Sequence, residues 1–485
     1  MSTQIQIVLS FVFFLILFTM IGIASSRYMT RSSEDYLVAG RSVNPWLIAL
    51  SAVSTNNSGY MFIGLIGFTW RVGLEAVWIT FGWILGDLIT WFWVHKKVRS
   101  QSETYDLVSV PAMVATDHEG KNQKVIGVIA GLLTLFFLGG YAAAQLKAGS
   151  TTLHAIFGWP TWLGAVIGVV IVTIYCMSGG IRASIWTDAA QSLVMIFAMT
   201  MLLTACYLKV GGPSELFSAL KAIDPKLVEL FPDGLALGFG LYFLGFVFGG
   251  VTTIGQPHIL VRFMAIDATE SINKARNIYF VWYTFFSAAA FGVGLYSRVL
   301  LPDLTKGLSG ADAIAATESA LPYLSIEMLA PILIGVILAG LFSATMSTAD
   351  SQILSCSAAV TQDVMPSFKK SYKAAKVATI GVAILALGIA LGASSGVFAL
   401  VLIAWSALGA TLGPVLVIRL AQLPLPNWLA VLMMTTGLSI VIYWGASDWS
   451  GAVFKALPGF VAPLLIYLVF YLGFIRSKKN PQSAG

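Results

Sequence analysis

Long apolar stretches alternate with short polar connections along almost the whole chain. Roughly 20 mainly apolar residues are enough to cross a bilayer as a helix. On that criterion the pattern predicts about 13 transmembrane helices and no soluble domain, so the expected fold class is an all-α polytopic membrane protein. The spans are expected near residues 5–25, 43–70, 73–94, 124–150, 160–178, 184–209, 234–257, 274–301, 325–359, 373–394, 396–420, 424–446 and 453–475.

Composition agrees with a chain that lipid solvates. The sequence is 58% hydrophobic and only 10% charged, whereas soluble domains carry about 25% charged residues. The three cysteines all fall in apolar stretches and show no zinc-ligand spacing. No phosphate-binding Gly-Lys-Ser/Thr loop, His-Glu-x-x-His pair or Gly-x-Ser-x-Gly elbow is present. ATP-driven transport and familiar hydrolase chemistry therefore lose support, and no enzyme activity is expected.

Charge in the connections predicts the orientation. With an uncharged N terminus outside and alternating spans, most of the 28 Lys and Arg residues fall on the inner side. The first apolar stretch has no basic region before it and no small-residue cleavage pattern after it, so we interpret it as a retained helix. The expected location is the cell (inner) membrane, with the N terminus outside and the C terminus cytoplasmic. Basic residues between spans indicate topology, and no nucleic-acid partner is expected.

The second span carries polar residues where hydrocarbon would penalise them. Ser, Thr and Asn make up most of the run from Ser51 to Tyr60, and Gly59 follows them. Because Ser and Asn compete for backbone hydrogen bonds and Gly weakens helices, we predict a break at mid-membrane. Such a break exposes carbonyl and N–H groups that can bind ions and substrates. The alternative is a continuous helix whose small residues pack against a neighbour.

The ninth span contains a second polar run, Ala344 to Gln352. Helical spacing places Ser347 and Thr348 on one face, and Ser347, Asp350 and Ser351 on an overlapping one. Hard cations take oxygen ligands of this kind. The alternative for the hydroxyls is a row of interhelical hydrogen bonds, but a buried carboxylate needs a partner or a cation.

Three further positions are unusual inside apolar spans. Asp188 lies one turn inside the sixth span, where it either shares its depth with Asp350 or pairs with nearby Arg182. Pro257 interrupts the seventh span, which predicts either a second broken helix or the membrane exit. Asp87 is intramembrane and either pairs or faces water.

Taken together, several segments resemble the sodium:solute symporter family, and within it the bacterial proline carriers most. The matching segments are Ala39-Gly-Arg-Ser42, Ser58-Gly-Tyr60, Trp186-Thr-Asp188 with Gln191, Gly255-Gln-Pro-His-Ile-Leu260, Arg262-Phe-Met-Ala265, Met346-Ser-Thr348, Ser355-Cys-Ser357 and Asp363. The resemblance implies the leucine-transporter (LeuT-like) 5+5 inverted-repeat fold. Residues 43–210 and 211–420 would form the two five-helix repeats. Residues 1–42 would hold a peripheral first helix and loop, and 421–485 two peripheral helices and a short cytoplasmic tail.

The resemblance also implies ion sites. The family's main sodium site maps onto backbone carbonyls of Ser54, Asn57 and Ala344 and hydroxyls of Ser347 and Thr348. Some relatives have a second sodium site, which maps onto Asp188, Ser347, Asp350 and Ser351. Asp350 stands where a hydroxyl residue is usual, which leaves open whether this second site binds differently or takes a proton.

Two departures concern the solute. The proline carriers have an acidic residue at the position of Asn56 and aromatics at the positions of Gly249 and Thr253, so we expect a wider, less aromatic cavity. The candidate solute-binding residues are Asn56, Ser58, Tyr141, Thr253 and Gln256.

The function expected is sodium-coupled import of a small polar organic solute by alternating access, with a proline-like amino acid leading. Carboxylates, sugars and vitamins follow as solutes, and proton coupling is the nearer alternative mechanism. A membrane sensor or a channel is a distant alternative. The expected partners are Na⁺, the solute and the lipid bilayer; a monomer is compatible with the sequence, which leaves the oligomeric state open.

Overall fold

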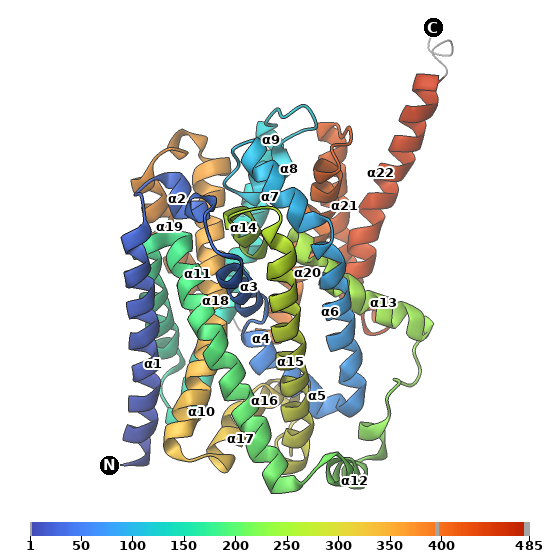
Figure 1. The fold of residues 1–485 in the computed structure, drawn as a ribbon. Coiled ribbons are helices and arrows are strands. Elements are labelled where there is room, and N and C mark those ends of the chain that lie inside the picture. The colour runs from blue at the N-terminus through green and yellow to red at the C-terminus, as the bar shows by residue number, and fades with distance from the viewer. Residues whose placement is uncertain (1, 393–396, 480–485) are drawn as a thin grey trace.

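The computed structural model describes residues 2–392 and 397–479, and nearly all of them are helical. Within these ranges there is no β-strand, only two isolated bridges, Val43 with Ile266 and Thr116 with Asn122. The long helices stand side by side in one bundle (Figure 1). The N terminus lies at the lower end of that view and α22 leaves the bundle at the upper end, which agrees with an odd number of crossings.

The α-helices are named in chain order. They are α1 Thr3–Ser25, α2 Ser33–Val38, α3 Pro45–Asn56, α4 Gly59–Phe62, α5 Gly64–Val72, α6 Val77–Trp91, α7 Val94–Thr104, α8 Val110–Ala115, α9 Lys124–Leu133, α10 Gly139–Phe157, α11 Thr161–Val210, α12 Pro213–Ile223, α13 Gly238–Val251, α14 Pro257–Ala265, α15 Ser271–Leu300, α16 Gly310–Thr317, α17 Ala320–Met328, α18 Pro331–Ala358, α19 Tyr372–Gly392, α20 Val397–Leu420, α21 Asn427–Ala446 and α22 Ala456–Lys479.

The structure does not confirm the predicted number of 13 membrane crossings. In the described ranges, 11 helical stretches are long and apolar enough to span a bilayer. One of them, α11, has 50 residues and a non-helical backbone at Gly180. A straight helix of that length would measure about 75 Å, more than twice the hydrocarbon thickness. The all-α membrane class is confirmed, whereas the count of about 13 and the division into repeats stay predictions.

Two of the predicted spans are interrupted inside the bundle. The second span ends its first half at Asn56 and resumes at Gly59, which confirms the predicted break. The seventh span passes through a 3₁₀ turn, Thr252–Gly255, and an extended Gln256 before α14 begins at Pro257. Every residue of α14 is buried. Of the two alternatives for Pro257, the structure therefore has the broken helix and not a membrane exit.

Helix α18 occupies the centre of the bundle. In its most apolar stretch 89% of the residues are buried, whereas for the peripheral α1 the share is 28%. It packs against α11, α1, α10 and α3. The Ser, Thr and Asp residues of α18 therefore face protein and not lipid, and this position places them beside the break after α3.

Candidate sodium and solute site

The break in the second span is built from local hydrogen bonding. Asn57 leaves the helical region at φ −87° and ψ 62°. Ser58 then caps α4, since its hydroxyl accepts a hydrogen bond from the Tyr60 N–H at 3.2 Å. The Gly59 N–H donates to Oε1 of Gln145 at 2.9 Å. Side chains thus satisfy N–H groups that the interruption frees, as buried backbone requires.

The predicted main sodium residues lie on two segments that touch. The Thr348 hydroxyl is 3.0 Å from the Thr55 carbonyl oxygen and 3.0 Å from the Ala344 carbonyl oxygen. The Thr55 hydroxyl is 3.4 Å from the Ser347 carbonyl oxygen. Ser54 precedes Thr55 in α3, Asn57 directly follows the end of α3, and both are buried too. The last turn of α3 therefore lies directly against the Ser347–Thr348 turn of α18.

The chemistry of these groups fits a monovalent cation. The candidate ligand atoms are carbonyl and hydroxyl oxygens, which hard cations prefer as ligands, and they lie away from water. The Asn57 amide oxygen is buried without a hydrogen-bond partner in the described part of the chain. At this junction the described residues therefore offer more oxygen acceptors than hydrogen-bond donors to satisfy them.

A buried arginine occupies the centre of the predicted second site. Arg262 of α14 lies 3.0 Å from Asp188 and 4.0 Å from Asp350, and all three side chains are fully buried. Arg262 also contacts the hydroxyls of Ser51, Ser184 and Ser351. Asp188 is therefore paired with Arg262. The alternative pairing with Arg182 is wrong, because Arg182 binds Asp35 at 2.7 Å.

The second site consequently already holds one fixed positive charge. Asp350 is held by the hydroxyls of Tyr175 at 2.7 Å, Ser184 at 2.8 Å and Ser351 at 2.7 Å. Asp188 Oδ1 is buried without a partner among the described residues. The prediction of a second sodium ion there stays a prediction. Arg262 was not among the predicted site residues, because an arginine near the end of a predicted span is expected on the inner side and not inside the bundle.

The candidate solute residues gather at the two breaks. Ser58 and Tyr141 pair through their hydroxyls at 3.1 Å. The Asn56 amide nitrogen lies 2.5 Å from the Tyr279 hydroxyl and 3.4 Å from Asp87 Oδ2. Asn56 and Ser58 thus flank the second-span break and each reaches a partner on another helix.

The other two candidates belong to the seventh span. Thr253 lies in the 3₁₀ turn, with its hydroxyl near the Asp87 carboxyl. The Gln256 amide donates to the Trp405 carbonyl at 2.9 Å, and its Oε1 has no hydrogen-bond partner among the described residues. Both candidates therefore lie where this second break exposes polar groups.

The expectation of a wider, less aromatic cavity than that of the proline carriers stays a prediction, but aromatic side chains do lie beside Gly249. A Cβ on Gly249 would lie 2.4 Å from the Trp83 indole nitrogen, so the Trp83 ring occupies the space beside that glycine. The same ring stacks on Trp405 at 5.4 Å and on Tyr60 at 5.8 Å between centroids. The aromatic surface comes from α6, and the earlier inference considered only α13.

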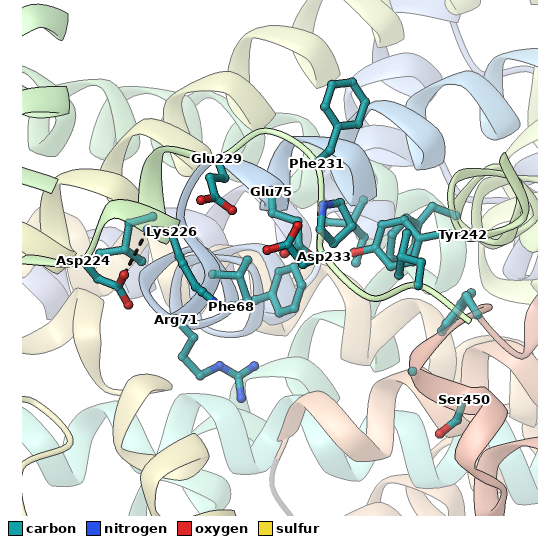
Figure 2. A pocket seen from close by; sticks show the side chains of 18 of the residues that line it. Phe68, Arg71, Glu75, Asp224, Lys226, Glu229, Phe231, Asp233, Tyr242 and Ser450 are labelled. Carbon is teal, nitrogen blue, oxygen red and sulfur yellow. Dashed lines mark hydrogen bonds between the residues drawn. The ribbon is translucent and has the colours of Figure 1, made fainter. Parts of the chain in front are cut away.

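A water-accessible cavity of about 640 Å³ lies on the same side of the bundle as α12. Figure 2 shows that side chains from α5, from the connection after α12 and from α13 line it. Four carboxylates face two cationic side chains there: Glu75, Asp224, Glu229 and Asp233 against Arg71 and Lys226. The cavity is therefore acidic, and it is larger than the recess of about 380 Å³ that Asp117 and Asn427 border.

Comparison with known sequences decides the family. A sequence model described as the sodium:solute symporter family matches residues 36–423. The chain belongs to the sodium:solute symporter family. Among its relatives, the high-affinity proline transporter of Bacillus subtilis is 29% identical over 446 residues, covering 90% of this chain and 92% of that protein. The sodium/proline symporter of Escherichia coli is 29% identical over 480 residues, covering 97% and 94%.

Solved structures support the fold. A Na⁺-coupled sialic acid symporter in a substrate-bound outward-open state matches with a TM-score of 0.78 at 17% identity, covering 96% of this chain and 97% of that one. A nucleobase-cation-symport-1 transporter in a closed conformation matches with a TM-score of 0.55 at 15% identity, covering 92% and 95%. These likenesses confirm a LeuT-like architecture for this family member.

Proposed function

We propose that this symporter imports a small polar organic solute together with Na⁺ by alternating access. The observation that carries the proposal is the contact between the Thr348 hydroxyl and the Thr55 carbonyl oxygen at the break after α3. A cation bound between these segments would join the interrupted helix to α18. Binding would then favour whichever conformation keeps the two segments together.

Sodium would be held by the carbonyls of Ser54, Asn57 and Ala344 and the hydroxyls of Ser347 and Thr348. The solute would bind beside the same break, next to Asn56 and Ser58. Coupling requires each ligand to favour the state that binds the other, typically by about 1–3 kcal/mol. The membrane potential adds about 2.3 kcal/mol per sodium charge at 100 mV. The protein would lie in the cell (inner) membrane with its N terminus outside.

An amino acid related to proline is the leading solute, because the relatives of this chain include proline transporters. Identities of 29% leave room for a different solute within the family. Carboxylates, sugars and vitamins are the other classes to be tested.

Uptake into proteoliposomes tests the coupling ion. Radiolabelled L-proline and one labelled member of each other solute class are offered under an inward sodium gradient, and then under a proton gradient without sodium. Accumulation only under the sodium gradient supports the proposal. Accumulation under the proton gradient alone, or equilibration without any gradient, contradicts it.

A further inference from the structure

Asp87 is a fully buried carboxylate in the middle of α6, only 1% exposed. Its Oδ2 accepts hydrogen bonds from Tyr279 at 2.6 Å and from Asn56 at 3.4 Å. Its Oδ1 has no hydrogen-bond partner in the described part of the chain, and no Lys, Arg or His of that part pairs with it. An unpaired carboxylate in such a place is costly, and it is most easily retained where a ligand supplies the missing charge.

The position of Asp87 places it between the two helix breaks. Asn56 is the last residue of α3, so its contact with Asp87 ties the carboxyl to the second-span break. Thr253 and the Trp91 indole lie close to the carboxyl outside hydrogen-bonding geometry. A Cβ on Gly250 would lie 2.6 Å from the Asp87 backbone nitrogen, so the backbones of α13 and α6 pack closely at this level. Asp87 thus faces the place where the solute is proposed to bind.

A stripe along α6 links Asp87 to the acidic cavity. Ile79, Trp83 and Asp87 are spaced four residues apart and so lie on one helix face. Ile79 lines the large cavity and also a small pocket whose lining includes Tyr60 and Trp83. From Ile79 to Asp87 the helix rises about 12 Å. A solute entering from the cavity would therefore follow this face to the carboxyl.

The net charge along this path is negative. The cavity offers four carboxylates and two cationic side chains, and the stripe ends on a carboxylate. Fields of this kind concentrate cationic ligands. The unpartnered Asp87 Oδ1 and Gln256 Oε1 are both acceptors, so a ligand that satisfies them must be a hydrogen-bond donor.

We propose that Asp87 is the specificity-determining residue of this symporter, and that it selects a solute with a protonated amine whose N–H donates to Asp87 Oδ1. This proposal deepens the proposed function and rests on it. It narrows the solutes to amino acids and other small amines. Carboxylates, sugars and vitamins that lack a protonated amine are excluded.

Matched solute pairs test the proposal in the wild-type protein. Purified protein in detergent with 100 mM NaCl is titrated with L-proline and with tetrahydrofuran-2-carboxylate, which has oxygen in place of the ring N–H. L-Alanine is paired with propionate and putrescine with 1,4-butanediol, and D-glucose is added alone. The expected result is that binding, measured calorimetrically, is confined to amine members of the pairs. Equal binding within a pair, binding of glucose, or the absence of any amine ligand overturns the proposal.

The variant Asp87→Asn sharpens the assignment. The Kd of the Asp87→Asn protein for the amine that binds is expected to rise at least tenfold. Asp87→Glu should recover part of this lost affinity. Asp363→Asn is the matched control, because Asp363, in the π-helical turn that follows α18, is a buried carboxylate that accepts a hydrogen bond from Ser109. Its Kd should stay within twofold. An unchanged Kd in Asp87→Asn overturns the proposal.

Sodium stabilisation of the solute-free protein separates the two claims. If NaCl raises the melting temperature above that in KCl but amines are not preferred, only the Asp87 proposal fails. If NaCl has no effect on stability or on solute binding, the sodium-coupled function itself fails.

Discussion

Arg262 and Asp188 form an ion pair of 3.0 Å in which neither side chain is exposed to solvent. The two residues come from different halves of the chain, on α14 and α11. Asp350 of α18 approaches the same guanidinium at 4.0 Å. Three helices are therefore joined around one charge on the side of the helix breaks away from the acidic cavity.

Replacing the arginine should be costly to the folded state. In Arg262→Met two carboxylates would remain buried without their counter-charge, and breaking such a pair typically costs about 3–5 kcal/mol. We expect a large fall in melting temperature in detergent. Adding Asp188→Asn and Asp350→Asn to Arg262→Met should restore a substantial part of the loss, since no uncompensated charge then remains.

The control for this experiment is Arg182→Met. Arg182 also pairs with a carboxylate, Asp35, but its side chain is 12% exposed, whereas that of Arg262 is fully buried. Arg182→Met should therefore lower the melting temperature clearly less than Arg262→Met does. Equal stability of Arg262→Met and the wild type would show that the buried pair does not hold these helices together.

Loss of one hydroxyl at the proposed sodium site should weaken ion binding. Ser347→Ala or Thr348→Ala removes one neutral ligand, and a hydrogen-bond-like contact to a charge is worth about 1.5–3 kcal/mol. The sodium concentration for half-maximal uptake is expected to rise about tenfold or more. Ser357→Ala on the same helix, whose hydroxyl donates to the Ala375 carbonyl, should leave it unchanged. Unaltered sodium dependence in both site variants would refute the assignment.

Local chemistry explains which parts of the site could be predicted from sequence. The break after Asn56 follows from Ser, Asn and Gly residues that compete with helix over a few positions. The proximity of Ser347 and Thr348 to that break came only from the family resemblance. The partner of Asp188 was missed because Arg262 lies 74 positions away, and a count of loop charges assigns an arginine near a span end to water.

The aromatic packing beside Gly249 was not predicted, for a similar reason. Small residues on α13 were interpreted as empty space, but the size of a cavity depends on what the facing helix supplies. Trp83 of α6 fills the room beside Gly249. Likewise, the partner of Asp87 is Tyr279, 192 residues away. The hydrophobic pattern predicts where the helices lie in the sequence. It does not predict which residues of distant helices contact one another.

The close approach of α6 and α13 should be sensitive to a single methyl group. A Cβ on Gly86 would lie 1.8 Å from the Val247 carbonyl oxygen, and backbone cannot yield easily. We expect Gly86→Ala to lower stability by about 1–3 kcal/mol, as overpacking does. Gly140→Ala on α10 is the control, because nothing lies within 4 Å of its Cβ and Ala favours helix. Thermal unfolding of both variants should show losses only for Gly86→Ala.

Removing the hydroxyl that orients Asp87 should affect the solute more than the ion. Tyr279→Phe deletes the 2.6 Å hydrogen bond to Asp87 Oδ2, so the carboxyl loses its main anchor while the α18 oxygens are untouched. We expect the uptake KM for an amine solute to rise about three- to tenfold, which corresponds to the roughly 0.6–1.4 kcal/mol of one hydrogen bond. The sodium dependence should stay as in the wild type. Tyr296→Phe on the same helix loses a hydrogen bond to the Gly211 carbonyl and should change neither parameter. Because Asn56 also reaches Asp87, the double variant Tyr279→Phe with Asn56→Ala should be weaker still, and a KM equal to that of the wild type would mean that Asp87 does not contact the solute.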